Sequence, residues 1–155
     1  MIVVSDAGPL ISLGAVGQLE LLPAQFERVL VPDAVWNEVV GHGAALPGAD
    51  AVREAKWIDV RTVADDAVRP FTDRLDPGEA AALALAIALH ADLYLVDDLA
   101  ARRMANAIGI PVVGTLGILL HAKMLGRIPA VKPILLAMTQ LGFRVSAELL
   151  RAVWS

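Results

Sequence analysis

The chain of 155 residues contains no cysteine, which excludes disulfides, iron–sulfur clusters and thiolate zinc sites. Histidine is scarce too, because His42, His90 and His121 are the only three and are too scattered for a His-rich metal site. Any metal that this protein binds would therefore be held by oxygen ligands.

Long hydrophobic runs are missing as well, although 57% of the residues are hydrophobic and the mean hydropathy is +0.62. The longest uninterrupted apolar run covers residues 80–89, whereas a helix that spans a bilayer needs about 20 such residues. The N-terminus has no basic flank and no small-residue cleavage pattern, so no secretory signal is visible. We therefore expect a cytoplasmic protein without a membrane partner. The apolar surplus predicts a subunit or partner interface on the helices from Leu116 onward and near Trp36.

Several catalytic signatures are also absent. The sequence has no Gly-Lys-Ser/Thr phosphate loop and no Gly-x-Ser-x-Gly elbow, and the glycines at 41 and 43 lack the third glycine of a dinucleotide site. A phosphatase that attacks through an aspartate often has a second Asp two residues later, but Gly8 occupies that place after Asp6. Aromatic residues make up only 5% of the chain, so the tryptophans are better explained as core or interface residues than as base-stacking platforms.

Charge is distributed unevenly along the chain. Residues 1–98 hold 16 acidic and 6 basic residues, a net charge of −10, while residues 99–155 hold 1 acidic and 7 basic residues, a net charge of +6. Such a division is typical of an acidic centre beside a basic rim, as in a metal-dependent enzyme that acts on a polyanion. The alternative is that the last helices carry their bases on solvated faces.

Short apolar runs alternate with helical stretches, a pattern typical of an α/β fold with a parallel sheet in one domain over residues 1–155. The expected strands cover residues 2–5, 28–31, 57–60, 93–96 and 111–113. The expected helices cover residues 10–22, 33–40, 44–56, 77–91, 99–108, 116–125, 130–141 and 146–153, with 63–76 as a loop or short helix. Asp76-Pro77-Gly78-Glu79 predicts a helix start close to a capping box.

Five acids stand where they can reach one edge of this sheet. Asp6 directly follows the first expected strand, and Asp97 and Asp98 directly follow the fourth. Glu38 lies on the helix after the second strand, and Glu79 lies in the first turn of the helix before the fourth. In a parallel α/β sheet, ligands bind beyond the carboxyl ends of the strands. The acids therefore become candidates for a shared site.

Each acid also has a local explanation. Asp6 can satisfy free backbone N–H groups, Asp98 can cap the helix that follows it, Glu79 can stabilise its own helix, and Glu38 can lie on an exposed helix face. If the acids converge instead, their like charges repel and raise one another's pKa, and a divalent cation would neutralise this repulsion. Carboxylate ligands select Mg²⁺ or Mn²⁺, which would lower the pKa of an attacking water and neutralise phosphoryl charge. The chemistry indicated is phosphodiester hydrolysis.

Several segments occur in a characteristic order. They are residues 2–6 (IVVSD), 31–39 (VPDAVWNEV), 75–86 (LDPGEAAALALA), 93–98 (LYLVDD) with 101–103 (ARR), and 113–117 (VGTLG). Together they resemble PIN-domain proteins, specifically the VapC-like toxin branch, over nearly the whole chain. The resemblance implies a three-layer α/β/α sandwich with about five parallel strands, usually dimeric. It also implies a Mg²⁺- or Mn²⁺-dependent endoribonuclease, the toxin of a toxin–antitoxin pair, whose partners are RNA and a small cognate antitoxin protein.

The resemblance also assigns residues by position. The acids that match the family pattern are Asp6, Glu38, Glu79 and Asp98, with Asp97 beside the last as a further metal candidate. The chain departs from the pattern at Ala7, Gly8 and Val96, where many relatives have a hydroxyl, and Glu79 is one methylene longer than the Asp of toxin relatives.

Three more residues near these acids have two readings each. Arg102 and Arg103 are candidates for contact with RNA phosphates or an acidic partner, or else form surface ion pairs. Thr115 either supplies a hydroxyl to a metal-bound water or caps the next helix. The alternative to the enzyme is a catalytically weak or inactive PIN-like module that binds RNA or a partner.

Overall fold

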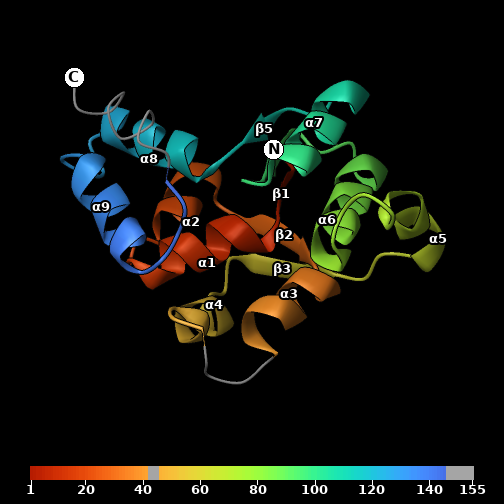
Figure 1. Cartoon of the computed structure of the whole chain (residues 1–155), viewed down its shortest axis with the longest axis horizontal. Coiled ribbons are helices and arrows are strands. Elements are labelled where there is room, and N and C mark those ends of the chain that lie inside the picture. Colours follow the sequence, from red (N-terminus) through yellow and green to blue (C-terminus); the bar gives the residue numbers. More distant parts are fainter. Residues whose placement is uncertain (42–45, 146–155) are drawn as a thin grey trace.

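The computed structural model describes residues 1–41 and 46–145 and contains one sheet of five parallel strands (Figure 1). The strand order is β3-β2-β1-β4-β5, with β1 in the centre between β2 and β4. The strands are β1 (Val3–Ser5), β2 (Val29–Pro32), β3 (Ile58–Arg61), β4 (Leu93–Leu95) and β5 (Val112–Val113). The predicted parallel α/β sheet is confirmed.

Helices cover both faces of the sheet. They are α1 (Ala7–Ala15), α2 (Leu21–Phe26), α3 (Asp33–Val40), α4 (Ala49–Glu54), α5 (Asp65–Val68), the 3₁₀ helix η1 (Arg69–Phe71), α6 (Pro77–Ala88), α7 (Leu99–Ile108), α8 (Thr115–Met124) and α9 (Lys132–Gln140). Because crossovers between parallel strands are right-handed, the step from β1 to β2 places α1 and α2 on one face, and the steps to β4 and β5 place α6 and α7 on the other. Helix α3 contacts both α1 and α6. Figure 1 shows α6 and α7 on one side and α1, α2, α8 and α9 on the other. The three-layer sandwich is confirmed.

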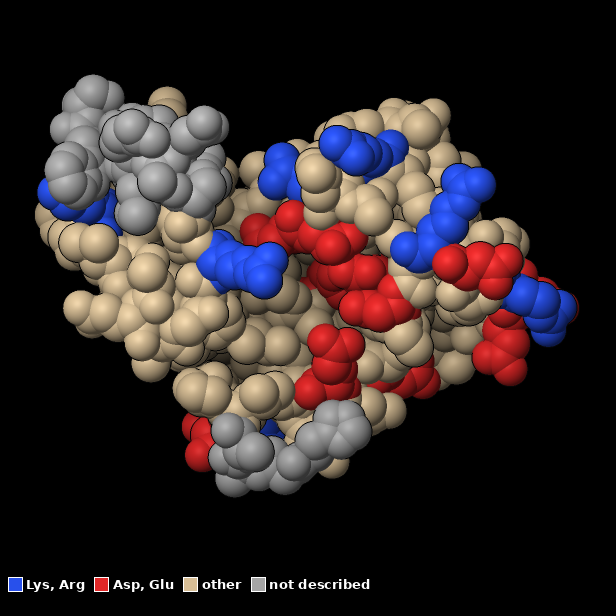
Figure 2. Space-filling view, in the orientation of Figure 1, with Lys and Arg blue, Asp and Glu red and all other residues tan. Residues whose placement is uncertain are grey.

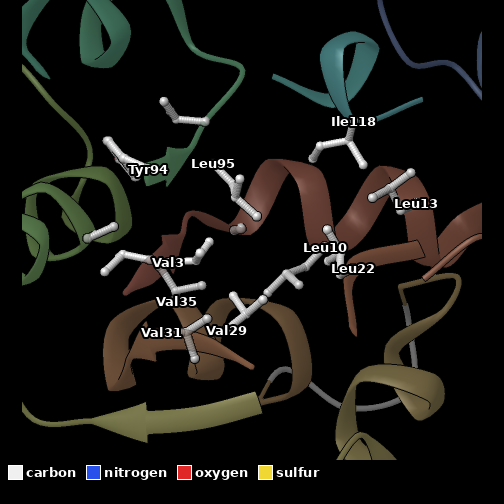
Figure 3. Packing of buried hydrophobic residues seen from close by; sticks show 14 of the residues in the cluster. Val3, Leu10, Leu13, Leu22, Val29, Val31, Val35, Tyr94, Leu95 and Ile118 are labelled. Atoms are coloured by element: carbon white, nitrogen blue, oxygen red, sulfur yellow. The ribbon is translucent and has the colours of Figure 1, made fainter. Parts of the chain in front are cut away.

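The core explains the continuous apolar strands. Every residue of β1 and β2 is buried, as expected for strands that are covered on both faces. In Figure 3, Val29 of β2 lies beside Leu10 of α1, and Ile118 of α8 lies near Leu13 of α1; all four residues are buried. No helix within the described residues is long and apolar enough to cross a membrane.

Some predicted boundaries were wrong. The helix expected over residues 10–22 is two helices, α1 and α2, because the chain turns at Gly17, whose φ of 72° is favourable for glycine only. The helix expected over 44–56 is the shorter α4. The loop or short helix expected over residues 63–76 is confirmed, because this segment contains the short α5 and η1. The helix expected over residues 146–153 lies outside the described residues. The capping box before α6 is confirmed.

Candidate active site

The central pair of strands brings two predicted acids to one edge of the sheet. Asp6 follows β1 and Asp98 comes shortly after β4, and these strands are hydrogen-bonded neighbours. The backbone N–H of Asp6 donates to the carbonyl of Leu95 at 2.9 Å, so the ladder continues to the position of the first acid. The Asp6 carboxylate then accepts a hydrogen bond from the N–H of Ala7 at 2.8 Å and caps α1.

The start of α6 adds a second pair of carboxylates. Asp76 accepts from the N–H of Glu79 at 2.8 Å, and the Glu79 carboxylate accepts from the N–H of Asp76 at 3.2 Å. Gly78 lies between them, and a Cβ at this residue would stand only 2.7 Å from Oε1 of Glu38. Glu38 of α3 therefore lies directly against the first turn of α6. A glycine here leaves the space that this carboxylate occupies.

Electrostatics show that these acids share one environment. Asp6 is only 5% exposed, and its burial raises its pKa to about 8; the Ala7 N–H opposes this rise, while the charges of Glu79, Asp76 and Glu38 add to it. Burial also raises the pKa of Glu79 to about 7, opposed by the Asp76 N–H and reinforced by Asp76, Asp98 and Glu38. We call Asp6, Glu38, Asp76, Glu79 and Asp98 the acidic cluster. Figure 2 shows acidic side chains gathered in the middle of one face with Lys and Arg side chains around them.

The neighbouring acids Asp97 and Asp98 have different surroundings. Asp98 caps α7, because its Oδ2 accepts from the N–H of Ala101 at 3.0 Å, and its charge acts on Glu79. Asp97 instead accepts two hydrogen bonds of 2.6 Å from Thr115, one from the backbone N–H and one from Oγ1. The cap residue of α8 is Gly114, and Thr115 is the first helical residue. The predicted capping role of Thr115 is therefore wrong, whereas its contact with a metal-bound water stays a prediction.

Two residues near the cluster were missed by the sequence reasoning. Asp76 was treated only as a helix cap, although its place three residues before Glu79 puts it at the same edge and its charge raises the pKa of both Asp6 and Glu79. Tyr94 is fully buried in β4, in register with Val4, and its hydroxyl has no hydrogen-bond partner among the described residues. Burial raises the pKa of this phenol, and the charges of Asp6 and Glu79 add to the rise. In the sequence, the only indication of Tyr94 is its polar hydroxyl in an otherwise apolar strand.

A cavity of about 670 Å³ lies beside the site. Its walls are mainly apolar side chains of α1, α8 and α9, and Asp97, Arg102 and Thr115 line it as well.

Arg102 is half-buried and forms no ion pair within the described part of the chain, while Arg103 is exposed. Large apolar side chains are exposed in the region where the sequence predicted an interface. In α8 and the turn after it, the exposed fractions are 40% for Leu120, 83% for Met124 and 52% for Leu125.

A comparison with protein families agrees with this arrangement. The family model described as PIN domain matches residues 2–155. The chain belongs to the PIN-domain family. No curated protein matches the sequence significantly. The PIN domain is a nuclease-type fold, so the acids at the sheet edge of this PIN domain stand where a hydrolytic site is expected.

The donor chemistry of this PIN domain fits the divalent cation that such folds use. All candidate ligands are carboxylates, the ligands that Mg²⁺ and Mn²⁺ prefer. Burial is the main cause of the raised pKa of Asp6 and Glu79, and the charges of neighbouring acids add to it, so a cation at this edge would offset that part of the rise. Within residues 1–41 and 46–145, no three His, Asp or Glu side chains already surround a point that could hold a metal ion. Mg²⁺ does not require such a group, because it keeps several waters and binds through one or two carboxylates together with substrate phosphates.

Proposed function

We propose that this PIN domain is a Mg²⁺- or Mn²⁺-dependent endoribonuclease that hydrolyses RNA phosphodiester bonds, as the toxin of a toxin–antitoxin pair. The observation that carries the proposal is the acidic cluster, in which burial and like charges raise the pKa of Asp6 to about 8 and of Glu79 to about 7. Without cations such a cluster retains protons near neutral pH, and a divalent cation replaces them.

We assign the metal to the edge formed by Asp6 after β1, Glu79 at the start of α6 and Asp98 after β4, where one or two of these carboxylates would bind it directly and the others through its waters. Asp97 is the less suitable member of its pair, because both of its oxygens already accept hydrogen bonds from Thr115. Glu38 supplies a further catalytic carboxylate from α3. When bound, the cation lowers the pKa of an attacking water and neutralises charge on the phosphoryl oxygens.

The basic residues around the cluster support a polyanionic substrate. Arg102 lines the cavity beside Asp97, and Arg103 is exposed on the same helix, α7. Guanidinium groups bind phosphates in a bidentate manner, and such contacts position a nucleic acid without reading its sequence. We assign both arginines to RNA phosphates.

The partners proposed with this function are a small cognate antitoxin protein and a second copy of the chain. The exposed apolar residues of α8 support an interface of this kind. The cytoplasmic location and the single domain over residues 1–155 stay predictions. One observation favours the alternative of a weak or inactive PIN-like binding module: no three described carboxylates are already arranged around a metal.

Cleavage of RNA by the purified protein tests the proposal. We expect cleavage of a structured RNA with Mg²⁺ or Mn²⁺, none in EDTA, and a loss of at least about 100-fold in Asp6→Asn, because this change removes a proposed metal ligand. Asp73→Asn is the matched control, since Asp73 is exposed and does not act on the pKa of the cluster acids. Mn²⁺ should also raise the melting temperature of the wild type but not of Asp6→Asn. Cleavage in EDTA, or full activity of Asp6→Asn, would contradict the assignment, whereas RNA binding in EDTA without any cleavage would support the binding module.

A further inference from the structure

A chain of three hydrogen-bonded side chains lies at the border between the acidic cluster and the cavity. Oγ of Ser12 is 3.1 Å from Oγ1 of Thr115, and Oγ1 of Thr115 is 2.6 Å from Oδ2 of Asp97. Ser12 belongs to α1, Thr115 begins α8, and Asp97 precedes α7. Ser12 and Thr115 are thus in hydrogen-bond contact although they are 103 positions apart in the sequence.

The direction of the hydrogen bonds follows from the number of protons. An ionised carboxylate only accepts, so the single hydroxyl proton of Thr115 goes to Asp97. Ser12 must therefore donate its own proton to Thr115. The backbone N–H of Thr115 also donates to Oδ1 of Asp97 at 2.6 Å, so each oxygen of this carboxylate is held separately.

Burial makes this arrangement rigid. Ser12 and Thr115 are only 6% and 7% exposed, so water competes little for their hydroxyls. Hydrogen bonds to a charged group are stronger than those between neutral groups. Asp97 is exposed, but the hydrogen bonds from Thr115 fix the position of its carboxylate.

The fixed carboxylate lies next to Arg102. A Cβ on Gly114 would stand 2.8 Å from Oδ1 of Asp97 and 2.7 Å from Nη1 of Arg102, so both groups approach the same point. The two groups do not form an ion pair within 4.0 Å. The Arg102 guanidinium therefore lies near the start of α8 and near the Asp97 carboxylate without a direct ion pair to it.

We propose that Ser12 and Thr115 are positioning residues: they fix the Asp97 carboxylate, whose charge attracts the nearby Arg102 guanidinium, and this guanidinium binds an RNA phosphate beside the acidic cluster. Asp97, Arg102 and Thr115 all line the cavity, so a phosphate bound there would lie in it. This inference rests on the proposed RNA substrate and adds a role for two hydroxyls that no acid-based mechanism uses. It also gives Asp97 a task distinct from that of Asp98.

The test measures binding of a fluorescein-labelled single-stranded RNA in EDTA, so that no cleavage is needed. We expect Arg102→Ala to weaken binding about tenfold and to reduce the salt dependence by about one phosphate contact. Thr115→Val, which has the same shape but lacks the hydroxyl, should weaken binding about threefold to tenfold. Thr115→Ser keeps the hydroxyl and should stay within about twofold of the wild type.

A double-mutant cycle separates positioning from general damage. If Thr115 acts through Arg102, then Thr115→Val has no further effect on RNA binding in the Arg102→Ala background. Gly114→Ala provides a second variant, because its methyl group displaces Arg102 and Asp97 while Thr115 remains, and it should weaken binding as Thr115→Val does. Denaturation curves identify any variant that fails to fold.

The possible failures are distinguishable. Equal RNA affinity of wild type and Thr115→Val, additive effects in the cycle, or no RNA binding by the wild type would each overturn the positioning role. The proposed nuclease fails separately, if the wild type binds RNA but does not cleave it with Mg²⁺ or Mn²⁺. A loss of binding in Thr115→Val that Thr115→Ser restores supports the inference in either case.

Discussion

Four carboxylates at the edge of the sheet each accept a hydrogen bond from a backbone N–H at the start of a helix. Asp6 does so for α1, Asp76 for α6, Asp98 for α7 and Asp97 for α8. A helix N-terminus carries a partial positive charge, so it stabilises a nearby carboxylate. Capping a helix and contributing to the candidate site are therefore compatible roles for these acids, because one side chain can cap a helix and still face the site.

Asp6 should make the stability of the protein depend on pH. Its pKa is about 8 in the folded state, against the ordinary aspartate value of 3.8, so between these pH values the folded protein retains a proton that the unfolded chain has lost. In EDTA this favourable effect is complete below about pH 4 and is lost as the pH rises through about 8. Asp6→Asn removes the titrating group and keeps a good helix cap.

We therefore expect Asp6→Asn to raise the free energy of unfolding in EDTA by roughly 2–4 kcal/mol at pH 8 and by almost nothing at pH 4. Urea denaturation at the two pH values measures the difference. An equal effect at both values would mean that Asp6 ionises normally in the folded protein.

At the scale of the element, the start of α6 combines a cap with a charge. Asp76 forms the capping box and also raises the pKa of Asp6 and Glu79. Two variants separate these effects, because Asn keeps the cap without the charge and Ala removes both. We expect Asp76→Ala to lower the free energy of unfolding by about 1 kcal/mol relative to Asp76→Asn, measured by urea denaturation. If the two variants are equally stable, the cap contributes nothing.

Most elements could be predicted because their signals are local. Continuous apolar runs predicted the buried strands β1 and β2, and Asp76-Pro77-Gly78-Glu79 predicted the start of α6. The division of residues 10–22 into α1 and α2 was missed, since Gly17 is tolerated in a helix and only the positive φ of the folded chain reveals the turn.

The candidate site could be predicted only in part. Asp6 and Asp98 were identified because they follow neighbouring strands, a relation that topology rules supply. The contact between Asp97 and Thr115 joins residues 18 positions apart, and the Ser12 contact spans 103 positions. No periodicity or motif records such contacts, so they emerge only when helices pack in three dimensions.

At the scale of the whole molecule, the exposed apolar residues of α8 predict self-association. Met124 is 83% exposed, and a second copy of the chain would bury it. We expect Met124→Glu to convert a homodimer into a monomer, because a carboxylate in a buried apolar interface is costly. Light scattering after gel filtration gives the mass of each species.

Val60→Glu is the control for this change. Val60 is also exposed and apolar but lies on the edge strand β3, so the same substitution there should leave the dimer intact. A wild-type protein that is monomeric at micromolar concentration would contradict the homodimer.

The adjacent residues Asp97 and Asp98 are bound to the starts of two different helices, α8 and α7. The two helix ends are thus connected through a single peptide unit, which spans about 3.8 Å between Cα atoms. The starts of α7 and α8 therefore cannot shift far relative to each other without breaking one of these hydrogen bonds. The spacing of these two helix starts at the edge of the sheet is thus limited by the covalent backbone and not only by side-chain packing.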